Sequence, residues 1–158
     1  LSSTMRRASE MKHIKKIIQV GARGIGSGDY QDYKDAIKWG VKFFTSEYVH
    51  SKGISEIIEY IDPNSNVIIC IDIDSMDPSI TPNTIGRQPG GLTYFQVMSL
   101  LKSTINKTKV RAINFTEILP EVDIDGIGGL TVSRLVTATM GLLSRNWRRN
   151  YVIFISFL

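Results

Sequence analysis

The sequence predicts an α/β domain with a mostly parallel sheet. Segments rich in β-branched residues alternate along the chain with segments that show the apolar period of helices, and this alternation is typical of parallel sheets with right-handed crossovers. Asn66–Ile71 (NVIICI) is almost entirely apolar, as expected for a strand that is buried on both faces. Because the 158 residues contain no internal repeat or low-complexity linker, we expect one hydrophobic core.

The composition excludes several classes of protein and site. Hydrophobic residues make up 42% of the chain and charged residues 22%, which are values of a globular protein and not of a disordered one. The formal net charge is +4, but the Lys and Arg residues are scattered and are not interleaved with aromatic residues, so no nucleic-acid partner is expected. One Cys and two His rule out a disulfide framework, a Cys-based zinc site and a site built mainly from imidazoles.

The hydropathy of the chain gives an expectation about its location. No apolar run approaches the roughly 20 residues of a membrane span, and no apolar signal region is evident. We therefore expect a cytoplasmic protein with no membrane partner. The single cysteine, Cys70, lies inside the apolar run 66–71, where buried packing is the expected role.

The first part of the chain contains the patterns of three helices and two strands. The segment 3–11 has helical composition, with Ser3 or Thr4 as a candidate N-cap. A β-branched apolar strand that ends in glycine follows at Ile14–Gly21, and a short helix at Asp32–Gly40. A short strand lies at Val41–Thr45, and a helix with an apolar period near 3.6 lies at Ile54–Ile61.

The second part of the chain begins with a long loop after the apolar strand. This loop, Asp72–Gly91, holds three of the five prolines, and a long loop inside a compact domain is usually functional. Thr93 and Gln96 form a T-x-x-Q capping box, which predicts a helix that runs to about Ile105. A further strand and a last amphipathic helix follow, at Lys109–Thr116 and Leu130–Leu143.

Asp72 and Asp74 are the strongest candidates for chemistry. They stand two residues apart at the end of the apolar strand, and in extended backbone such residues project to the same face. Ligands of parallel sheets bind at this carboxyl end of the strands. Two carboxylates so close together repel each other unless a cation lies between them, and oxygen ligands suit Mg²⁺ or Mn²⁺. The alternative is a solvated Asp-rich turn in which Asp74 and Asp77 act as caps.

Three uses of these acids can be compared. A calcium-binding EF-hand loop that began at Asp72 would require glycine where Asp77 stands, so this use is excluded. A Mg²⁺ phosphatase that uses Asp72 as its nucleophile gains partial support from Ser75 and from the acidic pair Asp123 and Asp125. A two-metal hydrolase that activates a water molecule is the third use.

The sequence beyond these acids resembles a known family. The segment 72–93, DIDSMDPSITPNTIGRQPGGLT, is similar to the ureohydrolase signature of the arginase and agmatinase family, which has D-x-D-x-x-D-P, a Pro-containing loop and P-G-G followed by a hydrophobic residue and Thr or Ser. Four further segments agree in order. They are the STMRRA and IQVGARG stretches, an E-x-x-P-x-x-D stretch that begins at Glu117, and Gly129-Leu130-Thr131, which is similar to the start of the family's final helix. The resemblance covers about residues 1–143 and is closer to the agmatinase branch.

The resemblance implies a fold and a reaction. The fold would be the three-layer α/β/α arrangement of arginase with a mostly parallel sheet, incomplete at its N-terminus. Asp72 and Asp74 would be ligands of a binuclear Mn²⁺ centre, with Asp74 also catalytic, and Glu117 would face the guanidinium group of the substrate. A metal-bridging hydroxide would attack the guanidinium carbon of an agmatine-like compound and yield urea and an amine, as in polyamine biosynthesis. Asp77 would order the loop.

The resemblance also implies that the site in this chain is partial. The family motifs G-G-D-H and D-A-H-x-D supply the other ligands, and neither occurs here; His13 and His50 lack that context and are expected at the surface. We expect residues 1–145 to be the carboxyl-terminal part of a ureohydrolase domain in a homo-oligomer, a trimer or hexamer, and residues 146–158 to be an atypical apolar tail. The alternative is a catalytically incomplete ureohydrolase-like protein that acts through assembly.

Overall fold

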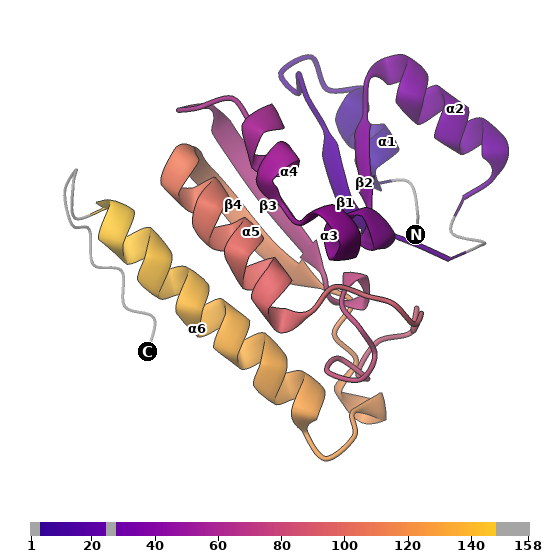
Figure 1. Ribbon diagram of the computed structural model, residues 1–158, viewed down its shortest axis with the longest axis vertical. Helices are drawn as coiled ribbons and strands as arrows, with labels where there is room; N and C mark the ends of the chain where they lie inside the picture. The colour runs from indigo at the N-terminus through magenta and orange to yellow at the C-terminus, as the bar shows by residue number, and fades with distance from the viewer. Residues whose placement is uncertain (1–3, 25–27, 148–158) are drawn as a thin grey trace.

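The computed structural model describes residues 4–24 and 28–147 and confirms the α/β class. Helices and strands alternate along the chain (Figure 1). The elements are α1 (Thr4–Ser9), β1 (Ile18–Ala22), α2 (Tyr30–Trp39), β2 (Lys42–Thr45), α3 (Ser46–Lys52), α4 (Ser55–Tyr60), β3 (Asn66–Asp72), the 3₁₀ turn η1 (Ile73–Ser75), α5 (Tyr94–Lys107), β4 (Lys109–Thr116), the 3₁₀ turn η2 (Pro120–Val122) and α6 (Ile127–Trp147).

The strand pairs are parallel, as the sequence predicts. β1 pairs with β2, and β3 pairs with β4, in two separate two-stranded sheets within the described residues. In the second sheet Cys70 lies opposite Asn114, and Asp72 lies opposite Thr116, so β3 and β4 end at the same level. The carboxyl ends of both strands therefore meet at one edge of this sheet, next to the loop that connects β3 to α5 (Figure 1).

The core lies between the β3–β4 sheet and the helices that cover one of its faces. α5 and α6 lie side by side across this sheet (Figure 1). Ile71 of β3, Ile105 of α5 and Leu135 of α6 are buried in one cluster, and the burial of such side chains is the main favourable contribution to folding. The cluster also takes in Phe44, Val49, Ile57, Ile73, Met76, Leu92, Val97, Leu101 and Val132.

The other face of the β3–β4 sheet is exposed, and here two sequence predictions are wrong. β3 was expected to be buried on both faces, but its residues alternate, and Ile68 has 60% of its surface exposed. Cys70 is on the same face and is also exposed, although buried packing was expected for it. The physical reason is that burial of a second face needs a second covering layer, and the described residues place none over Ile68 and Cys70.

Several element boundaries follow from local signals. α5 has the expected capping box, with reciprocal hydrogen bonds between Thr93 and Gln96, and it begins and ends close to the predicted positions. β4 has the predicted bounds Lys109–Thr116. β1 begins at Ile18, four residues later than expected from Ile14, and α3 was not predicted at all.

The last helix is longer than the sequence suggests. α6 runs over Ile127–Trp147, whereas Leu130–Leu143 was expected, and the predicted tail lies almost wholly in residues 148–158, outside the described residues. Ile127–Arg145 is long and apolar enough for a membrane span, although no such span was expected. The expectation rested on uninterrupted apolar runs, and small polar residues interrupt the run in this helix. Helices in the cores of soluble proteins also meet these criteria, and the buried Val132 and Leu135 show that α6 has such a core face.

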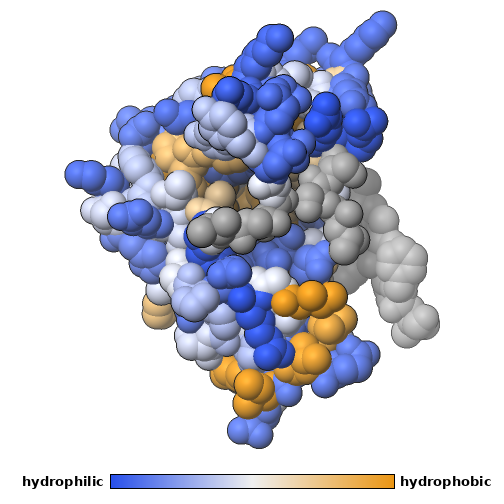
Figure 2. Space-filling view, turned by 90° about the vertical axis from the view of Figure 1, so that its right-hand side faces the viewer, coloured by the Kyte–Doolittle hydropathy of each residue, from blue (hydrophilic) through white to orange (hydrophobic). Residues whose placement is uncertain are grey.

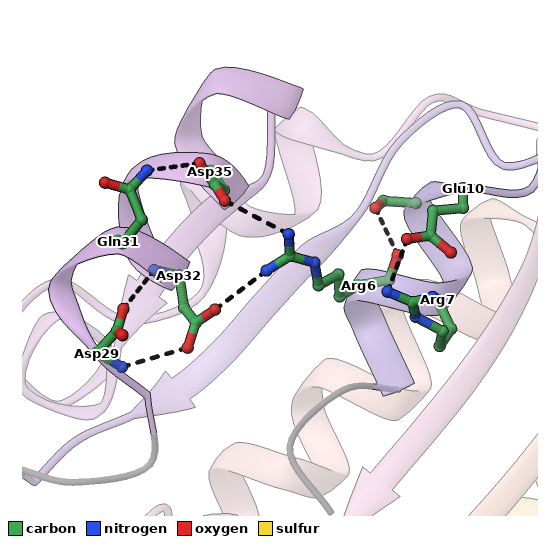
Figure 3. A network of polar contacts seen from close by, with 8 residues as sticks. Arg6, Arg7, Glu10, Asp29, Gln31, Asp32 and Asp35 are labelled. Atoms are coloured by element: carbon green, nitrogen blue, oxygen red, sulfur yellow. Dashed lines mark hydrogen bonds and ion pairs between the residues drawn. The ribbon is translucent and has the colours of Figure 1, made fainter.

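α1 is tied to α2 by a surface network of ion pairs (Figure 3). The Arg6 guanidinium lies 3.2 Å from a carboxylate oxygen of Asp32 and 3.6 Å from one of Asp35. Asp32 also takes part in the capping box that starts α2 after Asp29. Exposed pairs of this kind add little stability individually, so the network contributes little to the free energy of folding.

Candidate metal and substrate site

Three carboxylates gather where β3 and β4 end. Asp72 is the last residue of β3 and pairs with Thr116, the last residue of β4, and Glu117 follows Thr116 directly. Asp74 stands two residues after Asp72, in η1. The topology thus brings together the three residues that the sequence singled out, at the sheet edge where parallel α/β proteins bind ligands.

Asp72 and Asp74 come together through a turn. The chain leaves the extended conformation at Ile73, and a carboxylate oxygen of Asp72 accepts a hydrogen bond from the Asp74 amide at 3.3 Å. The Ser75 hydroxyl donates to the Asp72 carbonyl at 2.6 Å. The expected convergence of the two acids is therefore present, although a short 3₁₀ turn produces it and an extended strand does not.

The electrostatics of Asp72 show that its negative charge is poorly compensated. Partial burial of the carboxyl group and repulsion by Asp74 raise the pKa of Asp72 from 3.8 to about 6, and Glu117 adds to this repulsion. Burial and like charges both disfavour an ionised carboxylate. A divalent cation would reverse this penalty, so the charge and the oxygen donors at this edge fit a hard metal ion.

Glu117 is held in an uncommon backbone conformation. Its φ is +61°, in the left-handed region that costs a residue with a side chain about 1–2 kcal/mol. The side chain is exposed beside the two aspartates. Residues in this conformation occur in turns and at functional sites, and here the conformation turns the chain at the end of β4.

Asp77 orders the loop that follows the two acids. One of its carboxylate oxygens accepts hydrogen bonds from the amides of Gly90 and Gly91 at 3.0 and 3.1 Å, and the other accepts from Ser79 at 3.0 Å. The bonds from Ser79, followed by those from Gly91 and Gly90, lower the pKa of Asp77. This carboxylate ties both ends of the loop together, which is the role that the family resemblance implied.

Glycines let the loop pass close to η1. A Cβ on Gly91 would lie 2.2 Å from the Met76 carbonyl carbon, and Gly90 has a φ of +74°. A Cβ on Gly86 would lie 2.3 Å from a carboxylate oxygen of Asp74. The backbone of this loop therefore lies directly against one of the candidate ligands.

Arg23 is a residue of this region that the sequence did not single out. Its guanidinium donates to the carbonyls of Asp74 at 2.7 Å, Met76 at 3.0 Å and Gln88 at 2.8 Å. The arginine lies in the IQVGARG segment after β1. Its partners are 51 to 65 residues away in the sequence, so only the fold reveals the contact.

Other candidate residues have structural roles. Both carboxylate oxygens of Asp123 accept hydrogen bonds from backbone amides at the start of α6, from Ile124, Gly128 and Gly129 at 2.8 to 2.9 Å, and these bonds from Gly129, Gly128 and Ile124 lower its pKa. This pairing removes the support that Asp123 gave to a phosphatase. Exposed apolar side chains surround η2 and the start of α6. Figure 2 shows apolar residues at the lower end of the molecule, where η2 and the start of α6 lie in Figure 1.

The histidines do not complete the site. His13 and His50 are exposed, as expected, and a ring nitrogen of His50 lies 2.9 Å from the Gly91 carbonyl oxygen. Within residues 4–24 and 28–147, no group of three or more His, Cys, Asp or Glu side chains is arranged to hold a metal ion. The carboxylates thus fit a metal in charge and donor type, but the described part of the chain supplies only part of a ligand set.

Comparison with known proteins identifies the family. The sequence model of the Arginase family matches residues 1–141. The chain belongs to the arginase family. It is 32% identical over 135 residues to N(1)-aminopropylagmatine ureohydrolase of Thermus thermophilus, and this alignment covers 83% of this chain and 44% of that protein. It is 27% identical over 146 residues to the mitochondrial arginase of Medicago truncatula, and that alignment covers 91% of this chain and 42% of the arginase. The chain therefore spans less than half the length of these arginase-family relatives.

Solved structures confirm the fold. Agmatine ureohydrolase of Thermoplasma volcanium superposes with a TM-score of 0.77 at 22% identity, over 93% of this chain and 48% of that one. Proclavaminate amidino hydrolase of Streptomyces clavuligerus superposes with a TM-score of 0.71 at 26% identity, over 81% and 43%. The arginase-like fold expected from the sequence is thus correct, and the family's relatives are hydrolases by name. The ligand roles of Asp72 and Asp74 and the substrate role of Glu117 remain predictions.

Proposed function

We propose that the protein hydrolyses a guanidino compound to urea and an amine, and that this chain supplies the carboxylate part of the active site. The observation that carries the proposal is the grouping of Asp72, Asp74 and Glu117 at the carboxyl edge of the β3–β4 sheet in a chain of the arginase family. The remaining part of the site would come from sequence beyond these 158 residues, since the chain spans 44% of its Thermus relative.

The proposed cofactor is a pair of Mn²⁺ ions. Asp72 and Asp74 would hold it, because their oxygens are hard donors and the negative charge on Asp72 is unfavourable without a cation. When bound, such a pair makes a nucleophile available from water near neutral pH. Asp74 packs against Gly86 and so has a restricted position, from which its carboxylate can take a proton from the attacking water and pass it to the leaving amine.

Glu117 is proposed to bind the guanidinium group of the substrate. A carboxylate accepts paired hydrogen bonds from a planar guanidinium, and such charge-assisted pairs are strong and directional. Glu117 is exposed at the same edge as the aspartates. An agmatine-like substrate is favoured because similar proteins include N(1)-aminopropylagmatine ureohydrolase and agmatine ureohydrolase. A homo-oligomer, a cytoplasmic location and a role in polyamine synthesis remain predictions.

The test is a double substitution in the full-length protein. We expect Asp72→Asn with Asp74→Asn to abolish urea release from agmatine and to lower the bound manganese measured by elemental analysis. The matched control is Asp62→Asn, because Asp62 forms an exposed ion pair with Lys16 and precedes β3, at the opposite end of the strand. Unchanged manganese content and urea release in the double variant would falsify the ligand assignment.

The second candidate is a catalytically incomplete ureohydrolase-like protein that acts through assembly. It is favoured by the absence of a group of three metal-ligating side chains from the residues that the structure describes. Calorimetric titration of the full-length protein with Mn²⁺ separates the two functions. Tight binding of two Mn²⁺ ions per chain would eliminate the second candidate, and absence of binding would eliminate the first.

A Mg²⁺ phosphatase with Asp72 as nucleophile is the third function to test. A phosphatase of this type needs a second acidic pair, for which Asp123 and Asp125 were the candidates. Backbone amides occupy the Asp123 carboxylate, so this pair is not available. The phosphatase function predicts turnover of phosphate esters and trapping of an aspartyl-phosphate analogue such as beryllium fluoride at Asp72. Neither result is expected from a ureohydrolase.

A further inference from the structure

Arg23 bridges two separate stretches of the loop that surrounds the candidate ligands. On one side its guanidinium donates to the carbonyls of Asp74 at 2.7 Å, Ser75 at 3.2 Å and Met76 at 3.0 Å. On the other side it donates to the carbonyls of Gln88 at 2.8 and 3.2 Å and Pro89 at 3.2 Å. One side chain thus joins the start of the loop to its end.

Among the residues that the structure describes, the partners of Arg23 are backbone oxygens only. Within residues 4–24 and 28–147 it forms no ion pair with a carboxylate, and a longer bond of 3.4 Å to the Gly21 carbonyl ties the guanidinium back to β1. A guanidinium presents five donors in a fixed plane, and this plane is matched by carbonyls from three segments. An ammonium group, with its donors on one atom, cannot reproduce this pattern.

These contacts fix the surroundings of Asp74. Arg23 binds the carbonyl of Asp74 itself, and Gly86, which precedes Gln88 by two residues, lies against the Asp74 carboxylate. Both the backbone that carries this carboxylate and the loop that confines it are therefore held by the same side chain. In other proteins, loss of a group that hydrogen-bonds a metal ligand lowers metal affinity about 10- to 100-fold, and we expect an effect of this order when the backbone and the loop around Asp74 are released.

We propose that Arg23 is a positioning residue that holds the Asp74 carboxylate in the orientation needed to bind a divalent cation. This role rests on the proposed function, because the cation is the Mn²⁺ that Asp72 and Asp74 would hold in a hydrolase. Arg23 acts through the backbone carbonyls that it binds. Its role is to make one rigid unit of η1 and the segment 86–91.

The experiment is Arg23→Lys in the full-length protein, with Mn²⁺ as the probe. The positive charge is kept and the planar set of donors is lost, so we expect Mn²⁺ affinity to fall about tenfold or more while the melting temperature of the metal-free protein changes little. At saturating Mn²⁺ the electron paramagnetic resonance signal of the bound ion is expected to broaden, because Asp74 then adopts several orientations. A purely structural role would leave this signal unchanged.

The control is Arg111→Lys. Arg111 makes a hydrogen bond of 2.8 Å to Asn66 at the start of the sheet, away from the carboxyl edge, and its substitution is expected to leave Mn²⁺ affinity and the spectrum unchanged. If Arg23→Lys binds Mn²⁺ as the wild type does, with the same spectrum, the proposal is wrong and the proposed function stands.

A second measurement covers the case in which the wild-type protein binds no Mn²⁺. That result would overturn the metal assignment and the orientation of Asp74 for a cation, and hydrogen exchange then decides only whether Arg23 joins η1 to the segment 86–91. Amide exchange in the segments 73–77 and 86–91 is expected to rise in Arg23→Lys and to stay unchanged in α5. Unaltered exchange in both loop segments would overturn the proposal.

Discussion

Gly86 lies against the carboxylate of Asp74 with no room for a side chain. A Cβ on Gly86 would be 2.3 Å from Asp74 Oδ2, much closer than two non-bonded atoms can approach. The loop after η1 can therefore confine the carboxylate only because residue 86 is glycine. This contact turns a loop residue with no chemistry of its own into a determinant of the candidate site.

Gly86→Ala is expected to displace the Asp74 carboxylate and to lower Mn²⁺ affinity more than about tenfold, in the range seen when metal-ligand orientation is lost. The backbone at Gly86 is not in the left-handed region, so alanine adds no backbone strain there and the clash is with the Asp74 carboxylate alone. Calorimetric Mn²⁺ titration and thermal unfolding of the metal-free protein check both expectations.

The matched control is Gly141→Ala in α6. A Cβ at Gly141 meets no atom within 4 Å, and alanine in a helix is more stable than glycine by about 0.5–1 kcal/mol. This variant is expected to unfold at a higher temperature and to bind Mn²⁺ as before. Equal Mn²⁺ affinity of Gly86→Ala and the wild type would contradict the confinement of Asp74.

Two substitutions at Glu117 are expected to separate its backbone strain from its charge. Glu117→Gly relieves the left-handed conformation at φ +61° and should stabilise the fold by about 1 kcal/mol, measured by urea unfolding. Glu117→Gln keeps the strain and removes the charge that would pair with a guanidinium. Both variants should show a KM for agmatine raised at least about tenfold, since a charge-assisted pair contributes about 1.5–3 kcal/mol. A normal KM in Glu117→Gln would exclude the substrate role.

The local signals in the sequence predicted the elements that they control. The capping box of Thr93 and Gln96 predicts the start of α5 because the hydrogen bonds of such a box join residues only three apart. The strand Lys109–Thr116 was likewise found with the right bounds. α3 was missed although a local signal for it exists, since the Thr45 hydroxyl caps the helix by accepting a hydrogen bond from the Tyr48 amide and Glu47 lies in its first turn.

The features that the sequence could not predict depend on distant residues. Whether Cys70 is buried depends on what covers the second face of its strand, and the strand itself carries no information about that cover. Apart from Gly21, the carbonyl partners of Arg23 lie more than 50 residues away in sequence. The acids of the candidate site were found because a strand end and a long spaced motif mark them locally.

The Asp77 carboxylate predicts a pH dependence of stability. Hydrogen bonds from Ser79, Gly91 and Gly90 hold its pKa below the ordinary value of 3.8. The folded state thus binds a proton less readily than the unfolded state, so the stabilisation is fully present above pH 3.8 and is lost as the pH falls through the lowered pKa. The free energy of unfolding of Asp77→Asn should be lower than that of the wild type at pH 7, and the difference should shrink below pH 4.

Urea unfolding at pH 7, 5 and 3, followed by circular dichroism, checks this dependence. Asp62→Asn is the control, because its exposed ion pair with Lys16 adds little stability and the substitution should have a small effect throughout. A difference for Asp77→Asn that is the same at pH 3 and pH 7 would show that the carboxylate charge does not order the loop.

Asp72→Asn is expected to have opposite effects on the metal-free and the metal-bound protein. With a pKa of about 6, Asp72 is ionised at pH 8 in the folded state, where partial burial and repulsion by Asp74 and Glu117 oppose its charge. The neutral amide removes this repulsion, so the melting temperature of chelator-treated protein should rise. Added Mn²⁺ should raise the melting temperature of the wild type, since a ligand that binds only the folded state stabilises it, and should not raise that of the variant. If the variant were less stable than the wild type without metal and gained the same increase from Mn²⁺, Asp72 would be a structural cap of η1 and not a ligand.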